Sequence, residues 1–191
     1  MKINIIGGGI GGLTIAITLQ QRGIEAHVYE AAAQIRPVGK GIWLPTNAML
    51  VMERLGLAEE LIAHGIELER IEVHDKTAGR LQAIDLVRIK QQFGRTTTSI
   101  LRADLQATLA AHLAEGTLHL NKRCTAVSQA TAQVTTHFND GSQAHGDLLI
   151  GADGLRSQVR EAVTPGVSLR YSGQTCYLGV SHIQLPPHLL R

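Results

Sequence analysis

Five glycines within six residues follow a short apolar run at the start of the chain, and this stretch limits the possible folds most strongly. Residues 3–6 predict a buried strand that ends at Gly7. Gly7, Gly9 and Gly12 have the spacing G-x-G-x-x-G. Glycines at this spacing permit a tight turn, a close approach of the backbone to a pyrophosphate, and close packing of a helix on a strand. We expect Gly11, in the same turn, to contact the ligand as well.

A strand–helix–strand unit is predicted around this turn. The helix should run from Gly12 to Arg22 and end at Gly23, with its free N–H groups and positive dipole end facing the phosphates. Ala26–Tyr29 predicts the second strand. Glu30 stands at its carboxyl end, 18 residues after Gly12, where a carboxylate can accept from two ribose hydroxyls. The alternative is an ordinary glycine-rich turn that binds no ligand.

Composition describes a soluble globular protein and excludes several function classes. The 191 residues suit one large domain, or one domain with part of another, and 44% are hydrophobic against 18% charged. The net charge of +2 comes from scattered Lys and Arg residues, and aromatic residues make up only 3%. A nucleic-acid partner is therefore not expected, because it needs a basic patch or stacking aromatics.

Targeting and metal-binding signals are absent from the sequence pattern. Lys2 precedes an apolar run that glycines interrupt too early for a signal peptide, and no run is long enough to span a bilayer. Cys124 and Cys176 lie far apart without a C-x-x-C, as expected of reduced thiols in a cytoplasmic protein. The nine histidines form no metal-ligand motif, so we expect no metal site.

The next part of the chain is predicted to connect the glycine-rich stretch to a hairpin. A glycine- and proline-rich connection is expected at residues 31–45, followed by helices at 48–55 and 58–63. Two paired strands are expected at 67–75 and 81–86, joined by a turn at 77–80. An exposed Thr-rich linker is expected at 93–98. Such a hairpin is in a position to line a substrate pocket.

A helix is predicted to start at Ser99. Leu101, Leu105, Leu109 and Leu113 recur every four residues, as an apolar stripe that faces a core. Arg102 stands in the first turn, where a cation gains nothing from the helix dipole. Its position indicates a ligand such as a phosphate or a ribityl oxygen, and the alternative is a solvated side chain.

Strands dominate the remaining sequence. They are predicted at residues 118–120, 124–128, 134–138, 147–150, 167–171 and 175–183, with a hairpin turn at Asn139-Asp140-Gly141 and a break at Pro186-Pro187. The apolar strand at 147–150 ends at Gly151, leads into a helix, and places Asp153 at its carboxyl end, where ligands of open α/β sheets bind. The alternative is that Asp153 only caps this helix.

Three segments resemble one known family. The spacing from Gly7 to Glu30 resembles the FAD fingerprint of flavoprotein monooxygenases and their relatives, a pattern that NAD-binding proteins share. The segment at 39–57, GKGIWLPTNAMLVMERLGL, resembles a loop and helix of the aromatic-hydroxylase branch in which the loop runs beside the flavin. The segment at 151–160, GADGLRSQVR, resembles the second fingerprint of flavin-dependent hydroxylases and favours FAD over NAD.

This resemblance implies a set of FAD contacts. The arginine of the segment at 101–109, LRADLQATL, contacts FAD in the family, and Val127 falls where the family makes a backbone contact to adenine. The full implied set is Gly7, Gly9, Gly11, Gly12, Glu30, Gly41, Arg102, Val127 and Asp153. No side chain is assigned an acid–base role, because the cofactor carries the chemistry.

The implied activity is that of an NAD(P)H- and dioxygen-dependent FAD monooxygenase that hydroxylates a small aromatic compound through a flavin hydroperoxide. Two alternatives stay open. One is a flavin oxidoreductase of the same superfamily that inserts no oxygen, such as a reductase of isoprenoid double bonds. The other is a non-catalytic remnant that binds the adenosine half of FAD, or nothing.

The expected fold is α/β, with an FAD-binding Rossmann-like parallel sheet, β-hairpin insertions and the start of a substrate-domain sheet. Residues 1–163 are predicted to form the FAD-binding domain, with 66–98 on the substrate side, and residues 164–191 an incomplete substrate domain. The family's third motif, which contains Gly-Asp, is not found in the sequence. We therefore expect a truncated gene product, a fragment or one part of a split protein. A strand at 175–183 would then present an unpaired edge to a second copy or to a complementing C-terminal chain.

Overall fold

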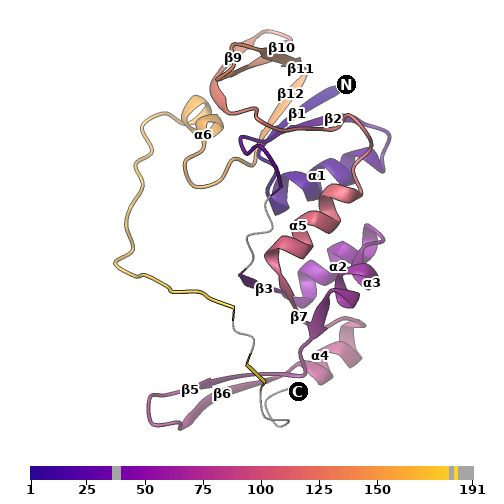
Figure 1. The fold of residues 1–191 in the computed structure, drawn as a ribbon, viewed down its shortest axis with the longest axis vertical. Coiled ribbons are helices and arrows are strands. Elements are labelled where there is room, and N and C mark those ends of the chain that lie inside the picture. Colours follow the sequence, from indigo (N-terminus) through magenta and orange to yellow (C-terminus); the bar gives the residue numbers. More distant parts are fainter. Residues whose placement is uncertain (36–39, 181–182, 185–191) are drawn as a thin grey trace. The chain divides into compact units, whose positions relative to one another are not determined.

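The computed structural model describes residues 1–35, 40–180 and 183–184 (Figure 1). The chain divides into two compact units. The first unit contains residues 1–37 and 106–176, and the second contains residues 38–105 and 177–191. The division falls within helix α5 (Arg102–Ala111). Parallel and antiparallel sheets occur together with helices, which confirms the predicted α/β class.

A parallel sheet forms the centre of the first unit. Its strands stand in the order β12 (Leu148–Gly151), β1 (Lys2–Ile6), β2 (Glu25–Tyr29) and β8 (Leu118–His119). The apolar run at the start of the chain becomes the buried strand β1, which pairs with β12 on one side and β2 on the other. The predicted parallel sheet is therefore confirmed.

Helix α1 (Ile10–Gln20) connects β1 to β2. It begins and ends two residues earlier than predicted, because Gly11 and Gly12 adopt helical geometry and only Gly7–Gly9 form the turn. Leu13, Ala16 and Ile17 are fully buried at the spacing of one helix face. Helix α1 ends at Gln20 with Gln21 as its C-cap, and the chain then turns at Gly23, which has a left-handed φ of +69°.

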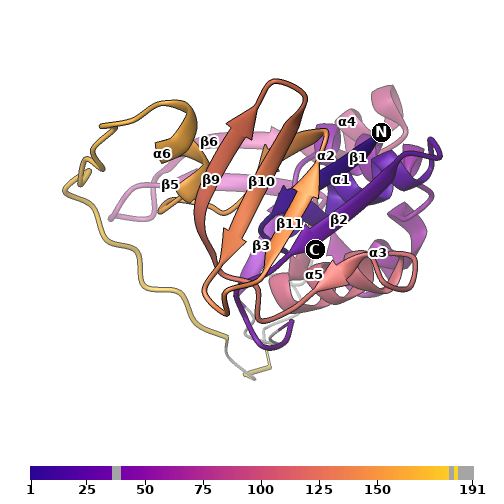
Figure 2. The ribbon, with the colours of Figure 1, turned by 90° about the horizontal axis from the view of Figure 1, so that it is seen from above.

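An antiparallel sheet of three strands completes the first unit. It consists of β9 (Cys124–Ala130), β10 (Gln133–Phe138) and β11 (Gln143–Gly146), which Figure 2 shows side by side. The predicted turn at 139–141 is confirmed, with Gly141 in the left-handed region and its N–H bonded to the Phe138 carbonyl. Helix α6 (Gln158–Val163) packs on β9 and β12. A buried cluster joins these parts: Ile6, Tyr29, Cys124, Phe138, Ala144 and Val159.

The second unit contains a smaller antiparallel sheet, a hairpin and short helices. The sheet has the order β3 (Gly41–Leu44), β7 (Thr98–Leu101) and β4 (Gly65–Glu67), and the hairpin consists of β5 (Arg70–His74) and β6 (Arg80–Asp85). The helices are α2 (Thr46–Arg54), α3 (Ala58–Ala63) and α4 (Leu86–Phe93). Helix α3 has its predicted bounds, and the predicted hairpin is confirmed. The single strand predicted at 67–75 is wrong, because it divides into β4, which pairs with β7, and β5.

Two further predictions in this unit are corrected. The linker at 93–98 is not exposed throughout, since Thr96, Thr97 and Thr98 are buried at the start of β7. Residues from Ser99 to Leu101 are strand and not helix, because β7 pairs with β3 on one side and β4 on the other. The helix begins only at Arg102, so Leu101 lies outside the apolar stripe that Leu105 and Leu109 form.

The strands predicted at 167–171 and 175–183 are not formed in the described part of the chain. Residues 167–180 are exposed and belong to no sheet, and Tyr177 keeps 95% of its surface in contact with solvent. A strand needs a neighbour to satisfy its backbone groups, and no strand of the described residues pairs with residues 167–180. The unpaired edge expected at 175–183 is therefore not observed over 175–180, and residues 181 and 182 lie outside the described part of the chain. Residues 36–39 of the predicted connection and Pro186-Pro187 lie outside the described residues.

Candidate cofactor site

The turn between β1 and α1 depends on two glycines for steric reasons. Gly7 has a φ of +108°, and a Cβ at this position would overlap the carbonyl of Ala152 at the end of β12. A Cβ at Gly12 would overlap the Gly7 carbonyl oxygen. The turn therefore lies against the neighbouring strand end, and the first turn of α1 lies against the turn itself. This agrees with the tight turn and close packing predicted from the spacing.

The other side of the turn is open. A Cβ added at Gly9 or Gly11 would meet no heavy atom of the described residues within 4 Å. Gly9 is the N-cap of α1, no described side chain caps the helix, and its first turn contains no acidic residue. The first N–H groups of an α-helix have no intrahelical partner, and they lie at its positive end. Together these features fit a phosphate-type anion.

Glu30 is fixed beside this turn by its own carboxylate. Oε2 accepts a hydrogen bond from the Gly8 N–H at 2.6 Å, and Oε1 accepts one from the Ala32 N–H at 2.8 Å. The backbone of Glu30 is held by His119 and Lys122 of the neighbouring segment. A carboxylate has about four acceptor positions, so two remain for further donors. The acceptance of ribose hydroxyls stays a prediction.

Asp153 stands after β12, on the other side of β1, and it caps helix α6. Its Oδ1 accepts from the Ser157 hydroxyl at 2.6 Å, and its Oδ2 accepts from the Gln158 N–H at 2.7 Å. A weaker contact joins Oδ2 to the Val159 N–H at 3.4 Å. The capping role that the sequence left open is thus observed. A contact of Asp153 with a cofactor stays a prediction.

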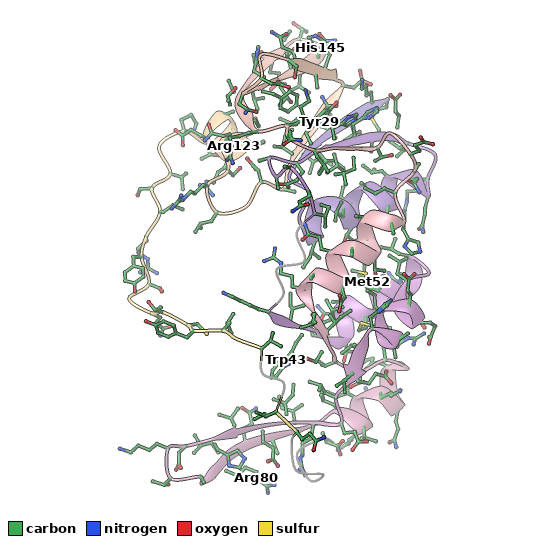
Figure 3. All side chains as sticks on the ribbon, in the orientation of Figure 1. Tyr29, Trp43, Met52, Arg80, Arg123 and His145 are labelled. Carbon is green, nitrogen blue, oxygen red and sulfur yellow. The ribbon has the colours of Figure 1, made fainter. Side chains whose placement is uncertain are left out.

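A pocket of about 130 Å³ lies at the carboxyl ends of β1, β2 and β12. Gly7, Glu30 and Asp153 line it together, as parallel topology predicts for residues that follow neighbouring strands. The other lining residues are Ile6, Tyr29, Ala31, Lys122, Arg123, Cys124, Arg156 and Gln158. Figure 3 shows Tyr29 and Arg123 in this part of the first unit. Lys122 is paired with Asp140 at 2.6 Å, whereas the side chains of Arg123 and Arg156 have no ion pair among the described residues.

Burial keeps two groups of this pocket neutral. It raises the pKa of the Cys124 thiol, an effect to which the negative charge of Asp153 adds. It also raises the pKa of the Tyr29 hydroxyl, with Glu25 contributing in the same direction. A protonated thiol is a poor nucleophile, so Cys124 is no candidate for a nucleophile in this pocket. Among the described residues, no group of three or more His, Cys, Asp or Glu side chains is placed to hold a metal ion.

The remaining predicted residues lie on other elements. Val127 is half-buried on β9 and packs against the cluster that contains Tyr29. Gly41 and Arg102 belong to the second unit, where Gly41 begins β3 and Arg102 begins α5. The Arg102 side chain is exposed, and its backbone N–H donates to the Lys40 carbonyl. The structure therefore brings together the turn, Glu30 and Asp153, all in the first unit.

The sequence patterns missed several residues of the site. Gln106 of α5 donates from Nε2 to the Gly8 carbonyl at 2.7 Å, a contact between positions 98 residues apart. Arg123 and Arg156 bring positive charge to the pocket. Arg156 lies inside the segment GADGLRSQVR, so its place in the site could be predicted from the sequence. No spacing rule indicates Gln106 or Arg123.

Comparison with known proteins identifies the family. The family described as "FAD binding domain" matches residues 1–184. The chain belongs to this family. It is 34% identical over 189 residues, or 98% of its length, to 3-amino-4-hydroxybenzoate 2-monooxygenase of Streptomyces cremeus. It is 35% identical over 187 residues, or 96% of its length, to the FAD-dependent urate hydroxylase of Klebsiella pneumoniae. It covers 48% of each relative.

A solved structure supports the same relationship. The crystal structure of Klebsiella pneumoniae HpxO complexed with FAD and uric acid superposes with a TM-score of 0.76 at 33% identity. The match covers 85% of this chain and 41% of that one. The predicted resemblance to FAD-dependent aromatic monooxygenases is confirmed, and the chain spans about half the length of the curated relatives it matches. No helix within the described residues is long and apolar enough to cross a bilayer.

Proposed function

We propose that this chain forms the FAD-binding part of a flavin-dependent monooxygenase that hydroxylates a small aromatic compound. The observation that carries the proposal is the uncapped start of α1, which lies behind an open glycine turn and beside the fixed carboxylate of Glu30. This arrangement offers donors to a pyrophosphate and acceptors to a ribose, the two polar groups of the adenosine diphosphate half of FAD. Relatives named as urate and aminohydroxybenzoate hydroxylases support the substrate class.

The residues of the first unit have separate tasks in this proposal. Gly7 and Gly12 shape the turn, Gly9 and Gly11 leave room for the phosphates, and Glu30 holds the ribose. The further proposed contacts are Val127 and Asp153, with Gly41 and Arg102 from the second unit. FAD, when bound, would take a hydride from NAD(P)H and transfer one oxygen atom of dioxygen to the substrate.

The chain itself supplies position and electrostatics in this scheme. Residues 1–163 are proposed as the FAD-binding domain, with 66–98 on the substrate side and 164–191 as the beginning of a substrate domain. No acid–base residue is assigned, because the cofactor carries the chemistry. We further propose a cytoplasmic location, in accord with the two cysteines, which lie far apart in the sequence without a C-x-x-C.

The first experiment is a comparison of FAD with FMN. Purified protein is mixed with either flavin, desalted, and examined by visible absorption. FMN lacks the adenosine half, so we expect FAD to be retained at about one per chain and FMN to be lost. Loss of both flavins would overturn the proposal, and equal retention of both would contradict the assignment of the turn to adenosine diphosphate.

The second experiment separates the activity classes. The FAD-loaded protein is assayed for NAD(P)H oxidation with and without dioxygen, in the presence of small phenols or urate. A hydroxylated product that requires dioxygen supports a monooxygenase. Oxidation of NAD(P)H without such a product favours the oxidoreductase that inserts no oxygen, and retention of FAD without turnover favours a binding role for this chain alone.

A further inference from the structure

Gly8 is held from two sides by side chains that lie far from it in the sequence. Its N–H donates to Glu30 Oε2 at 2.6 Å, and its carbonyl accepts from Gln106 Nε2 at 2.7 Å. The two groups belong to successive peptide units, 7–8 and 8–9. Glu30 therefore fixes the first of these units, and Gln106 fixes the second.

The contact with Gln106 also determines where the Gly9 N–H points. In a trans peptide the carbonyl and the following N–H point in opposite directions, and the described residues contain no cis peptide. With the Gly8 carbonyl turned toward Gln106, the Gly9 N–H must point away from that side chain. Glycines on both sides of this peptide would otherwise let it rotate at little cost.

We propose that Gln106 is a positioning residue that presents the Gly9 N–H to the pyrophosphate of FAD. The inference rests on the proposed function. Gly9 is the N-cap of α1, and a Cβ added there would meet no heavy atom of the described residues within 4 Å, so its N–H is a donor available to an anion. Gln106, Gly8 and Glu30 then form one connected chain that sets the phosphate donor and the ribose acceptor together.

The Gln106 contact could serve only to stabilise the fold, without positioning the Gly9 N–H for a phosphate. Two ligands that differ only in their phosphate groups distinguish these roles. Binding of ADP and of adenosine is measured by titration calorimetry for the wild type and Gln106→Leu. We expect Gln106→Leu to weaken ADP binding by roughly three- to tenfold, the effect of one misplaced hydrogen bond. Adenosine binding should change less than about twofold, because adenosine carries no group for the Gly9 N–H.

Gln20→Leu is the matched control. Gln20 likewise donates to a backbone carbonyl, that of His112 at 3.1 Å, and also joins α1 to the chain near the end of α5, but it lies away from the glycine turn. Its substitution should leave ADP binding unchanged. Gln106→Glu is the second variant, because a carboxylate cannot donate to the Gly8 carbonyl and adds repulsion toward phosphate. It should weaken ADP binding more than Gln106→Leu, and thermal unfolding confirms that each variant is folded.

The outcomes distinguish this inference from the proposed function. Equal weakening of ADP and adenosine in Gln106→Leu, or unchanged ADP binding in both Gln106 variants, would overturn the positioning role alone. A wild-type protein that binds neither FAD nor ADP would overturn the proposed function and the inference with it. Selective loss of ADP binding, with Gln20→Leu unaffected, would establish the positioning role.

Discussion

Two strand-to-helix turns of the first unit, β1–α1 and β12–α6, differ in whether side chains accept hydrogen bonds from the first N–H groups of the helix. In the second turn, Ser157 accepts from the Arg160 N–H, and Asp153 accepts from the N–H groups of Gln158 and Val159. In the first turn the N-cap is Gly9, and no side chain of the described residues accepts from the helix start. The chain satisfies the donors of α6 by itself and leaves those of α1 to water or to a ligand.

The two acidic residues that follow β2 and β12 differ in the same sense. Asp153 receives three donors from residues four to six positions after it, at the N-cap and the start of α6. Glu30 receives two donors, and one of them comes from Gly8 of the glycine turn. We infer that the first turn is the place of the ligand and that the second mainly stabilises the fold. The predictions below test this division.

The largest effect is expected from a methyl group at the closest contact of the first turn. Gly12→Ala would place a Cβ on the Gly7 carbonyl oxygen, so α1 must move away from the turn. Overpacking of this kind costs about 3 kcal/mol. Gly11→Ala is the matched control, since a Cβ there meets nothing within 4 Å. Thermal unfolding should show a loss of several degrees in the first variant and none in the second, and equal melting temperatures would contradict the packing described here.

The next effect concerns ligand binding through Glu30. Glu30→Gln removes the charge and turns an amide N–H toward one of the two backbone donors, Gly8 or Ala32. We expect FAD to bind more weakly by about 1.5–3 kcal/mol, the value of a hydrogen bond to a charged group. Glu25→Gln, at the exposed start of the strand that Glu30 follows, is the control. Titration of flavin fluorescence measures both, and an unchanged affinity in Glu30→Gln would remove the ribose assignment.

A smaller effect is expected for Asp153, on the stability of the fold more than on FAD affinity. Asp153→Asn keeps the size of the side chain but weakens the acceptance from Ser157 and the two N–H groups of α6. Stability should fall by about 1 kcal/mol, as for other lost caps, while FAD affinity should fall less than in Glu30→Gln. If Asp153→Asn instead reduced FAD affinity more than Glu30→Gln at unchanged stability, the division between the two turns would be wrong.

The features that could be predicted from sequence are those decided by neighbouring residues. The strand, glycine turn and helix at the start of the chain follow from local periodicity and spacing, and α3 was predicted with its observed bounds. Helix α4 was missed, although Asp85 accepts from the Arg88 N–H as an N-cap and Gly94 ends the helix in a left-handed conformation. Both signals were present in the sequence. The strand predicted at 81–86 overlaps this helix only at Leu86.

The features that could not be predicted depend on partners distant in the chain. Residues 99–101 have a helix-like leucine spacing, yet they form β7 because two strands from other parts of the chain pair with it. The strands expected at 167–171 and 175–183 have the right composition, but residues 167–180 have no strand neighbour among the described residues. In the site, the steric demands on Gly7 and Gly12 follow from spacing, whereas the contact from Gln106 to Gly8 exists only in the folded chain.

The smallest effect is a dependence of stability on pH that originates beside Glu30. His119, whose carbonyl accepts from the Glu30 N–H, has its pKa lowered from 6.5, first by burial and then by His27, Lys122 and Lys2. The folded state therefore disfavours the charged ring. As the pH falls below about 6.5, the unfolded chain binds the proton more readily, and stability is lost. Above that pH this contribution is complete.

The ring of His119 stacks on Tyr29, and its Nε2 lies 3.1 Å from His27 Nδ1. These contacts hold the His119 ring close to the His27 ring. His74 acts in the opposite direction, because contact with Glu72 raises its pKa. The test is therefore the difference in melting temperature between the wild type and His119→Gln from pH 7.5 to 5.5, in which the contribution of His74 cancels. We expect the wild type to lose more stability on acidification than His119→Gln. Melting temperatures that fall in parallel with pH would show that protonation of His119 does not affect stability.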